Sequence, residues 1–278
     1  MTAFFAARAI AGIETVASSR YTRSITIGSA IGFISVEPVA DRPALRATVT
    51  MSDPDEMPAV LARLRAMFDC DTDPLPIAAH LSNDPLLAPL LAARPGLRVP
   101  GAWDAWELAV RAILGQQITV VGARALAGRL VAQFGSELPL PQGAITHLFP
   151  PPSAVADVTE FGLALGMPRM RAASITGLAR AASDDPSLLS AGGGLDATVA
   201  RLRALPGVGS WTAHYIAMRA LRELDAFPAD DAGLRRATAT VLQPPSAAAL
   251  LARAERWRPW RAYAAQHLWS ADAQTARS

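Results

Sequence analysis

The first eighty residues alternate short β-branched runs with turn residues, a pattern typical of a small antiparallel sheet. Residues 21–27 and 31–36 are two such runs separated by a Gly-Ser-Ala turn, and residues 46–51 supply a third. Apolar residues then follow a helical spacing over residues 57–68, with arginines off the apolar stripe. We therefore expect a small N-terminal α+β domain over residues 1–78.

From about Ile77 the spacing of apolar residues becomes helical, interrupted by short breakers rich in proline and glycine. The predicted helices cover residues 104–114, 120–134, 153–165, 169–182, 195–205, 211–224, 231–241, 246–257 and 260–269. We expect residues 79–278 to form an all-helical second domain. The predicted fold class is therefore mainly α with a small N-terminal α+β domain.

The composition fits a globular protein of one large core or two modest ones, because 51% of the 278 residues are hydrophobic and only 18% are charged. No uncharged apolar run reaches the length of about eighteen residues that indicates a membrane span. The start of the chain also lacks the basic stretch of a signal peptide. We expect a cytoplasmic protein that does not contact a membrane.

Several cofactor chemistries are excluded by residues that the chain lacks. The single cysteine, Cys70, allows neither an internal disulfide nor a zinc or iron–sulfur site ligated by cysteines, and the four histidines show no metal-ligand spacing. All 26 basic residues are arginine. A GC-rich genome is sufficient to explain this bias, but whatever its cause, no lysine amine is available to form a Schiff base.

The net charge of +2 is unevenly placed, because residues 201–278 hold 11 of the 26 arginines and only 6 of the 24 acidic residues. A basic region of this kind is where a polyanion would be held. By itself, such an excess is more often just a solvated face.

The segment L-P-G-V-G-S-W-T-A, residues 205–213, joins two predicted helices and is the most informative part of the sequence. Gly207 and Gly209 permit a positive φ, so the chain can reverse within a few residues, and their bare backbone lets N–H groups approach a ligand closely. The positive end of the following helix points the same way. These features favour a site for a backbone phosphate. The alternative is a plain helix–helix turn that requires two glycines.

Asp230 and Asp231 follow this segment, with Asp231 placed 22 residues after Gly209, an interval of one helix and a return loop. A carboxylate at the start of a helix is usually only an N-cap. One member of the pair can fill that role, which leaves the other free to face a cleft.

Together these residues resemble the helix-hairpin-helix DNA glycosylases, and more narrowly the AlkA type of 3-methyladenine DNA glycosylase II. The resemblance rests on L-P-G-V-G-x-W-T-A followed by P-x-D-D, and it extends over most of the chain. Further similar stretches are FFAARAIAGIETVASSRYTRSI, AARPGLRVPGAWDAWELAVRAILGQQ, LGMPRMRAASI and ERWRPWRAYAAQHLW. The resemblance implies two helical subdomains that flank a cleft, with a hairpin at about residues 203–213.

The resemblance also implies roles for individual residues. Asp231 matches the catalytic carboxylate. The positions that match the base pocket are aromatic: Trp211, Tyr215, Trp269 and Phe4. The positions that match DNA contacts are Gly207, Gly209 and Thr212, through backbone amides, and Gln117. The backbone carbonyls of Arg203, Leu205 and Val208 match a monovalent-cation site, so we expect no required cofactor and at most a structural Na⁺ or K⁺ at the hairpin.

Two positions depart from the family pattern. Gln117 stands where the family has a leucine wedge, although an amide can also fill the gap that a displaced base leaves. Ala232 stands where the family has tyrosine after the aspartate pair, which changes the shape of the pocket and with it the range of damage accepted.

The implied chemistry is hydrolysis of the bond between an alkylated purine and its deoxyribose in double-stranded DNA, after the base is flipped out, to leave an abasic site. Related glycosylase-lyases carry a lysine directly after the hairpin, where this chain has Trp211, so we expect no lyase activity. The expected protein is a monomer associated with the nucleoid.

Three alternatives compete with this interpretation. A helix-hairpin-helix glycosylase for deaminated or oxidised purines would keep the fold and Asp231 and differ only in the pocket. A damage-binding module without activity is disfavoured, since Asp231 and both hairpin glycines are present. Some relatives carry a fused methyl-accepting regulatory domain, which we do not expect in this chain because it has one cysteine and the glycosylase resemblance takes up its length.

Overall fold

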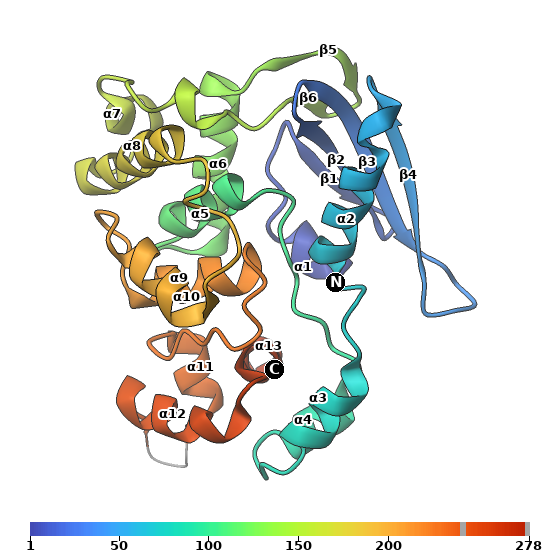
Figure 1. The fold of residues 1–278 in the computed structure, drawn as a ribbon, viewed down its shortest axis with the longest axis vertical. Helices are drawn as coiled ribbons and strands as arrows, with labels where there is room; N and C mark the ends of the chain where they lie inside the picture. The colour runs from blue at the N-terminus through green and yellow to red at the C-terminus, as the bar shows by residue number, and fades with distance from the viewer. Residues whose placement is uncertain (240–242, 276–278) are drawn as a thin grey trace. The chain divides into compact units, whose positions relative to one another are not determined.

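A computed structural model describes residues 1–239 and 243–275 of the chain (Figure 1). The chain forms two compact units. Unit 1 comprises Met1–Leu64 and Ala109–Leu188, and unit 2 comprises Arg65–Leu108 and Leu189–Ser278. The sequence boundary that we placed at residue 78 stays a prediction. Within the described part of the chain, no helix combines the length and the apolar character that crossing a membrane requires.

The N-terminal part of unit 1 is an antiparallel sheet in the order β1-β2-β3-β4 (Figure 1). Its strands are β1 (Glu14–Ala17), β2 (Arg20–Ile27), β3 (Ala30–Pro38) and β4 (Leu45–Met51). The three predicted strands are confirmed. The strand β1 is not predicted from the sequence, because β1 and β2 are joined by Ser18 and Ser19, both at positive φ (48° and 66°). Serine pairs rarely adopt that conformation, so they do not read as a hairpin turn.

A buried carboxylate fixes the start of β1. Glu14 is only 6% exposed, and it accepts hydrogen bonds from the Tyr21 hydroxyl (2.5 Å), the Ile10 amide (2.8 Å) and the Arg111 guanidinium (2.6 Å). Arg111 belongs to α5 (Ala105–Leu114). A buried charge that is paired and hydrogen-bonded in this way avoids the penalty of desolvation without a partner. The sheet is thereby tied to the helical part of unit 1.

The remaining elements of unit 1 show where the prediction of an all-helical region was wrong. The short helix α1 (Thr2–Ala6) and the longer α6 (Val120–Phe134) and α8 (Arg169–Asp184) are accompanied by a second antiparallel sheet of β5 (Glu137–Gln142) and β6 (Ile145–His147). Prolines within E-L-P-L-P-Q read as breakers rather than as a strand, and such prolines are tolerated at a sheet edge.

The helix predicted over residues 153–165 was also wrong. Only the 3₁₀ turn η2 (Pro152–Ala154) and the short α7 (Phe161–Leu165) are helical there, and Glu160 at φ 60° precedes α7. The left-handed conformation of Glu160 interrupts any continuous helix through this segment. The predictions for 57–68 and 120–134 are confirmed by α2 (Met57–Phe68) and α6, whose bounds coincide with the predicted ones.

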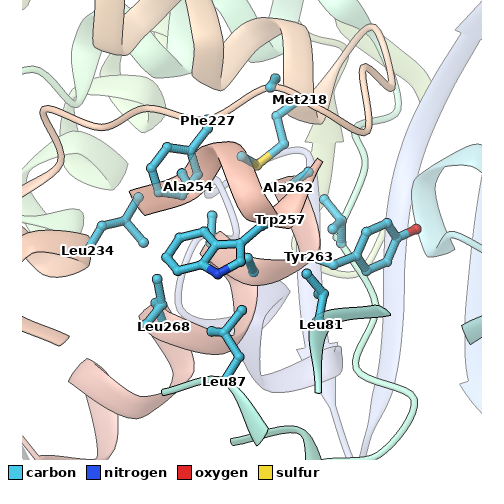
Figure 2. Close-up of a cluster of buried hydrophobic side chains, with 14 of the residues drawn as sticks. Leu81, Leu87, Met218, Phe227, Leu234, Ala254, Trp257, Ala262, Tyr263 and Leu268 are labelled. Carbon is cyan, nitrogen blue, oxygen red and sulfur yellow. The ribbon is translucent and has the colours of Figure 1, made fainter. Parts of the chain in front are cut away.

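Unit 2 is built from helices around one apolar core. They are α3 (Pro74–Leu81), α4 (Ala88–Ala93), α9 (Gly194–Arg203), α10 (Ser210–Arg219), α11 (Ala232–Ala237), α12 (Ala247–Ala254), η3 (Glu255–Trp257) and α13 (Arg261–Thr275). The 3₁₀ turn η1 (Pro54–Glu56) belongs to unit 1, where it lies before α2. Figure 2 shows Trp257 at the centre of the core, among Phe227, Leu234 and Leu268. The predicted class, mainly α with a small N-terminal α+β part, is confirmed.

Two helices of unit 2 end at least four residues earlier than predicted. The helix expected to reach residue 224 ends at Arg219, and Arg222 has φ 60°, a left-handed conformation that does not continue a helix. The helix expected over residues 231–241 ends at Ala237, while residues 240–242 lie outside the described residues.

Two buried aspartates hold the core of unit 2 together. Asp69 accepts hydrogen bonds from the Tyr263 hydroxyl (2.8 Å) and the Arg222 guanidinium (2.5 Å). Asp84 accepts from the Trp257 indole (2.8 Å) and Arg253 (2.8 Å). Because Tyr263 lies on α13, these bonds fix the helix that also carries Trp269.

Candidate active site

Asp231 is the N-cap of α11, and its carboxylate is held by three N–H donors. Oδ1 accepts from the Leu234 amide (2.9 Å) and from the Trp269 indole nitrogen (2.8 Å), and Oδ2 accepts from the Trp211 indole nitrogen (2.8 Å). From the sequence, one aspartate of the pair is expected to cap the helix and the other to face a cleft. That division is wrong, since Asp231 itself is the cap and Asp230 is exposed.

One carboxylate can both cap α11 and bind a ligand, because it can accept several hydrogen bonds. An ionised carboxylate offers about four lone-pair sites, and the three bonds leave one of them for a ligand. The donors come from α10, α11 and α13, so the position of Asp231 depends on the packing of three helices.

Three aromatic side chains surround this carboxylate. Trp211 and Tyr215 lie four residues apart on α10 and therefore share a face of the helix. Their rings are stacked at 5.0 Å between centroids and 9° between planes, and Trp269 meets Tyr215 edge to face at 6.3 Å and 71°. All three are partly exposed. The structure thus brings Asp231, Trp211, Tyr215 and Trp269 together, and we call this group the aromatic wall and its carboxylate.

Phe4 and Gln117 belong to unit 1 and are described within it. Phe4 is half-buried on α1, with the Arg8 guanidinium carbon 3.9 Å from its ring centroid. Gln117 is exposed in the loop between α5 and α6, and its φ is 57°. Arg171 donates a 2.6 Å hydrogen bond to the carbonyl of the preceding Gln116. The roles of Phe4 in a base pocket and of Gln117 as a wedge stay predictions.

The two glycines of the hairpin between α9 and α10 differ in backbone conformation. Gly207 has φ 78°, so the turn requires glycine there. Gly209 is instead extended (φ −82°, ψ −179°), so it does not use the positive φ that glycine permits. A Cβ added at Gly209 would meet no atom within 4 Å. Packing therefore does not demand glycine at 209, which leaves close approach of a ligand as a reason for it.

The start of α10 offers backbone donors beside these glycines. Gly209 is its N-cap without a side-chain cap, and the first bond within the helix runs from the Ala213 amide to the Gly209 carbonyl (3.0 Å). The amides of the first turn of a helix have no acceptor inside the helix. Thr212 lies in this turn with its side chain buried at 3% exposure, so a DNA contact there would involve its backbone. Trp211 of the aromatic wall occupies the same turn.

The residues proposed for a monovalent cation fit such an ion by their donor chemistry. Arg203 is the last residue of α9, where helix carbonyls lack partners within the helix and the dipole is negative. The Leu205 carbonyl accepts from the Val208 amide (3.1 Å), which closes the turn. Carbonyl oxygens are hard ligands, suited to alkali cations rather than to transition metals.

Gly233 is a site residue that the sequence analysis missed. A Cβ on it would lie 3.1 Å from Asp231 Oδ1, 3.0 Å from Asp272 Oδ2 and 3.3 Å from Trp269 Cδ1. Asp272 of α13 pairs in turn with Arg236 of α11 at 2.8 Å. Glycine inside a short helix lowers the stability of the helix, and its presence there is the sequence feature that could have identified Gly233. Its reason is the close approach of α11 to α13 beside the carboxylate.

Comparison with known families covers nearly the whole chain. Residues 1–104 match the AlkA N-terminal domain, and residues 110–262 match the HhH-GPD superfamily of base excision DNA repair proteins. The chain is 36% identical over 272 residues to DNA-3-methyladenine glycosylase 2 of Escherichia coli, which covers 97% of this chain and 92% of the relative.

A second relative is longer than this chain. The chain is 39% identical over 265 residues to a probable bifunctional transcriptional activator/DNA repair enzyme AlkA of Mycobacterium tuberculosis, which covers 95% of this chain but 53% of the relative. The chain thus spans about half the length of that protein. Among solved structures, a 3-methyladenine DNA glycosylase from Archaeoglobus fulgidus superposes with a TM-score of 0.83 at 25% identity, over 98% of this chain and 93% of that one.

Proposed function

Because the chain belongs to the HhH-GPD superfamily of base excision DNA repair proteins, we propose that it is a monofunctional DNA glycosylase for alkylated purines of the 3-methyladenine type. It acts on double-stranded DNA and leaves an abasic site. The observation that carries the proposal is the Asp231 carboxylate, which is held by hydrogen bonds from the indole nitrogens of Trp211 and Trp269.

Asp231 supports the bond-breaking step by electrostatics. Cleavage of the C1′–N bond develops positive charge on the sugar, as in glycosidases. A carboxylate that is already oriented stabilises this charge without having to reorganise during the reaction. The lone-pair site that the three donors leave open is available to the sugar or to the attacking water.

The aromatic wall supplies selectivity. Purines alkylated at N3 or N7 carry a formal positive charge, so they leave without strong acid assistance. Stacking of such a base on Trp211, Tyr215 or Trp269 adds about 1–2 kcal/mol over a neutral base, by analogy with cation–π contacts. The nucleotide must first leave the helix stack, which requires less energy at a damaged pair.

The hairpin holds the DNA strand near the flipped nucleotide. Backbone amides at Gly207, Gly209 and Thr212 are the proposed phosphate donors, and the carbonyls of Arg203 and Leu205, with that of Val208, would hold Na⁺ or K⁺. When bound, such a cation would supply positive charge at the hairpin. Because phosphate contacts dominate the binding, affinity for DNA should fall steeply with salt.

The chain has no lysine, so no side-chain amine attacks C1′. The proposed product is accordingly an abasic site in an unbroken strand. Treatment with borohydride during turnover should trap no covalent protein–DNA adduct above background, and a good yield of adduct would contradict hydrolysis alone.

A lesion-release panel tests the proposal. Duplexes that carry 3-methyladenine, hypoxanthine or 8-oxoguanine are incubated with the wild-type protein, Asp231→Asn and Asp230→Asn. We expect release of 3-methyladenine by the wild type and a loss of at least about 100-fold in Asp231→Asn. The exposed neighbour variant Asp230→Asn controls for the charge change and should retain its rate. Preferential release of hypoxanthine or 8-oxoguanine would assign another lesion, and equal rates in all three proteins would remove Asp231 from the mechanism.

A further inference from the structure

Arg219, the last residue of α10, is buried at 4% exposure although it carries a permanent charge. Arginine is rarely buried unless its donors are satisfied. Here Nη2 donates to the Gly101 carbonyl (3.0 Å), Nε donates to the Pro100 carbonyl, and Nη1 donates to the Tyr215 hydroxyl (2.6 Å). The guanidinium carbon lies 5.4 Å from the centroid of the Tyr215 ring.

These contacts form a short chain that ends at the carboxylate. Arg219 holds Tyr215, Tyr215 stacks on Trp211, and Trp211 donates to Asp231. We infer that Arg219 is a positioning residue for base release: it fixes the ring of Tyr215 and, through the stack, the indole that orients Asp231. This inference rests on the proposed glycosylase function and deepens it.

The physical reason is the geometry of the guanidinium. It is a planar fork whose donors point in fixed directions, and two of its nitrogens are anchored on backbone carbonyls of Pro100 and Gly101. The third donor therefore meets the Tyr215 oxygen at a set place. Without it, the Tyr215 hydroxyl loses the donor that sets its position, and a site displaced by about 1 Å can lose 100-fold in rate.

Arg222 offers a matched control from the same end of α10. It donates to the Val99 carbonyl (3.0 Å) and to Asp69 (2.5 Å), so it anchors the same loop that Arg219 anchors. Loss of Arg222 should lower the stability of unit 2. Arg222 binds Oδ1 of Asp69, whereas the Tyr263 hydroxyl that fixes α13 binds Oδ2 and is kept in Arg222→Met. The variant should therefore not release the stack of Tyr215 on Trp211.

The test compares Arg219→Met, Arg219→Lys, Tyr215→Phe and Arg222→Met. The readouts are the single-turnover rate of 3-methyladenine release at saturating protein, the Kd for abasic-site DNA by fluorescence anisotropy, and the near-ultraviolet circular dichroism of the aromatic rings. We expect both Arg219 variants to lose about tenfold or more in rate and to lose dichroism, with Kd within about twofold of wild type. Lysine should not rescue, because it is a compact charge without a fork.

Tyr215→Phe keeps the ring but removes the oxygen that Arg219 binds. Its rate should fall, and addition of Arg219→Met to it should lower the rate by less than about twofold more, since coupled residues are not additive. Arg222→Met should lower the Tm and keep the rate. If Arg219→Met keeps the rate and dichroism of Arg222→Met, the inference is wrong.

A failure of the proposed function has a different signature. The wild type would then release no 3-methyladenine, and the dichroism of Arg219→Met against Arg222→Met would still report whether Arg219 holds the stack.

Discussion

The indole nitrogen of Trp269 donates to Oδ1 of Asp231 over 2.8 Å, across 38 residues of sequence. The hydrogen bond joins the middle of α13 to the N-cap of α11. α13 is itself fixed in the core by the bond from Tyr263 to Asp69. The orientation of the carboxylate therefore depends on the packing of the helix that carries Trp269. A substitution that removes the indole N–H and keeps an aromatic ring tests this orienting bond.

Trp269→Phe removes that N–H and keeps an aromatic ring against the wall. Oδ1 would retain the Leu234 amide but lose one of its two donors. We expect the single-turnover rate of base release to fall about tenfold or more, because an orienting contact to the reacting group is lost. Trp260→Phe is the control, since Trp260 packs against the core beside Tyr263. Equal rates for the two variants would show that the indole bond does not matter.

Gly233→Ala should reverse the usual effect of this substitution. Alanine normally stabilises a helix interior by about 1 kcal/mol relative to glycine. At Gly233 the added carbon would lie 3.0–3.3 Å from Asp272, Asp231 and Trp269, which are held by hydrogen bonds from Arg236 to Asp272 and from Trp269 to Asp231. We expect a lower urea midpoint and a slower base release. Gly177→Ala in α8, where a Cβ meets nothing within 4 Å, should raise the midpoint. A Gly233→Ala protein as stable and as active as wild type would contradict the close packing.

Local patterns were sufficient for much of the fold. The helices α2 and α6 are predicted with their observed bounds, because their apolar positions keep a helical period and Pro58 lies in the first turn of α2, where proline is tolerated. α3 was missed since P-L-P-I-A-A-H-L reads as a breaker, although Pro74 and Pro76 lie at its start, where proline is tolerated, and Asp73 caps it. The prolines of β5 hide that strand in the same way.

In the candidate site, too, the sequence identifies the residues of a local motif but not those whose role depends on distant contacts. Asp231 and the hairpin glycines stand in a short local motif, so the sequence identifies them. Arg219 gives no such signal, because an arginine in the last turn of a helix is ordinarily a solvated charge. Its burial depends on the loop at Pro100 and Gly101, more than a hundred residues away in sequence. Contacts of that kind cannot be read from periodicity.

The two hairpin glycines should respond differently to alanine. Gly207→Ala places a side chain at φ 78°, which L-residues rarely adopt, and should destabilise the fold by about 1–2 kcal/mol. Residue 209 is extended, and a Cβ added there meets no atom within 4 Å, so the urea midpoint of Gly209→Ala should match that of the wild type. If a phosphate approaches there, its Kd for DNA should rise at least about tenfold, as an added methyl group blocks close approach. Anisotropy titrations and urea unfolding of both variants decide this. Unchanged DNA affinity in Gly209→Ala would leave the hairpin as a turn only.

Acid should destabilise the protein through His267. Burial lowers the pKa of this histidine to about 4, with a hydrogen bond to the Leu90 backbone opposing the shift and Arg94 adding to it. The pKa in the unfolded chain is about 6.5, so the unfolded state binds more protons between the two values. The stability that neutral His267 contributes is therefore fully present above about pH 6.5 and is lost as the pH falls toward 4. Between pH 7.5 and pH 5 the loss amounts to about 2 kcal/mol.

Urea unfolding of wild type and His267→Leu at both pH values measures this loss. Burial also lowers the pKa of His214, but that contribution is common to both proteins and cancels in the comparison. The wild type should lose more stability than the variant by this amount, and parallel losses would show that His267 does not titrate as a buried neutral group.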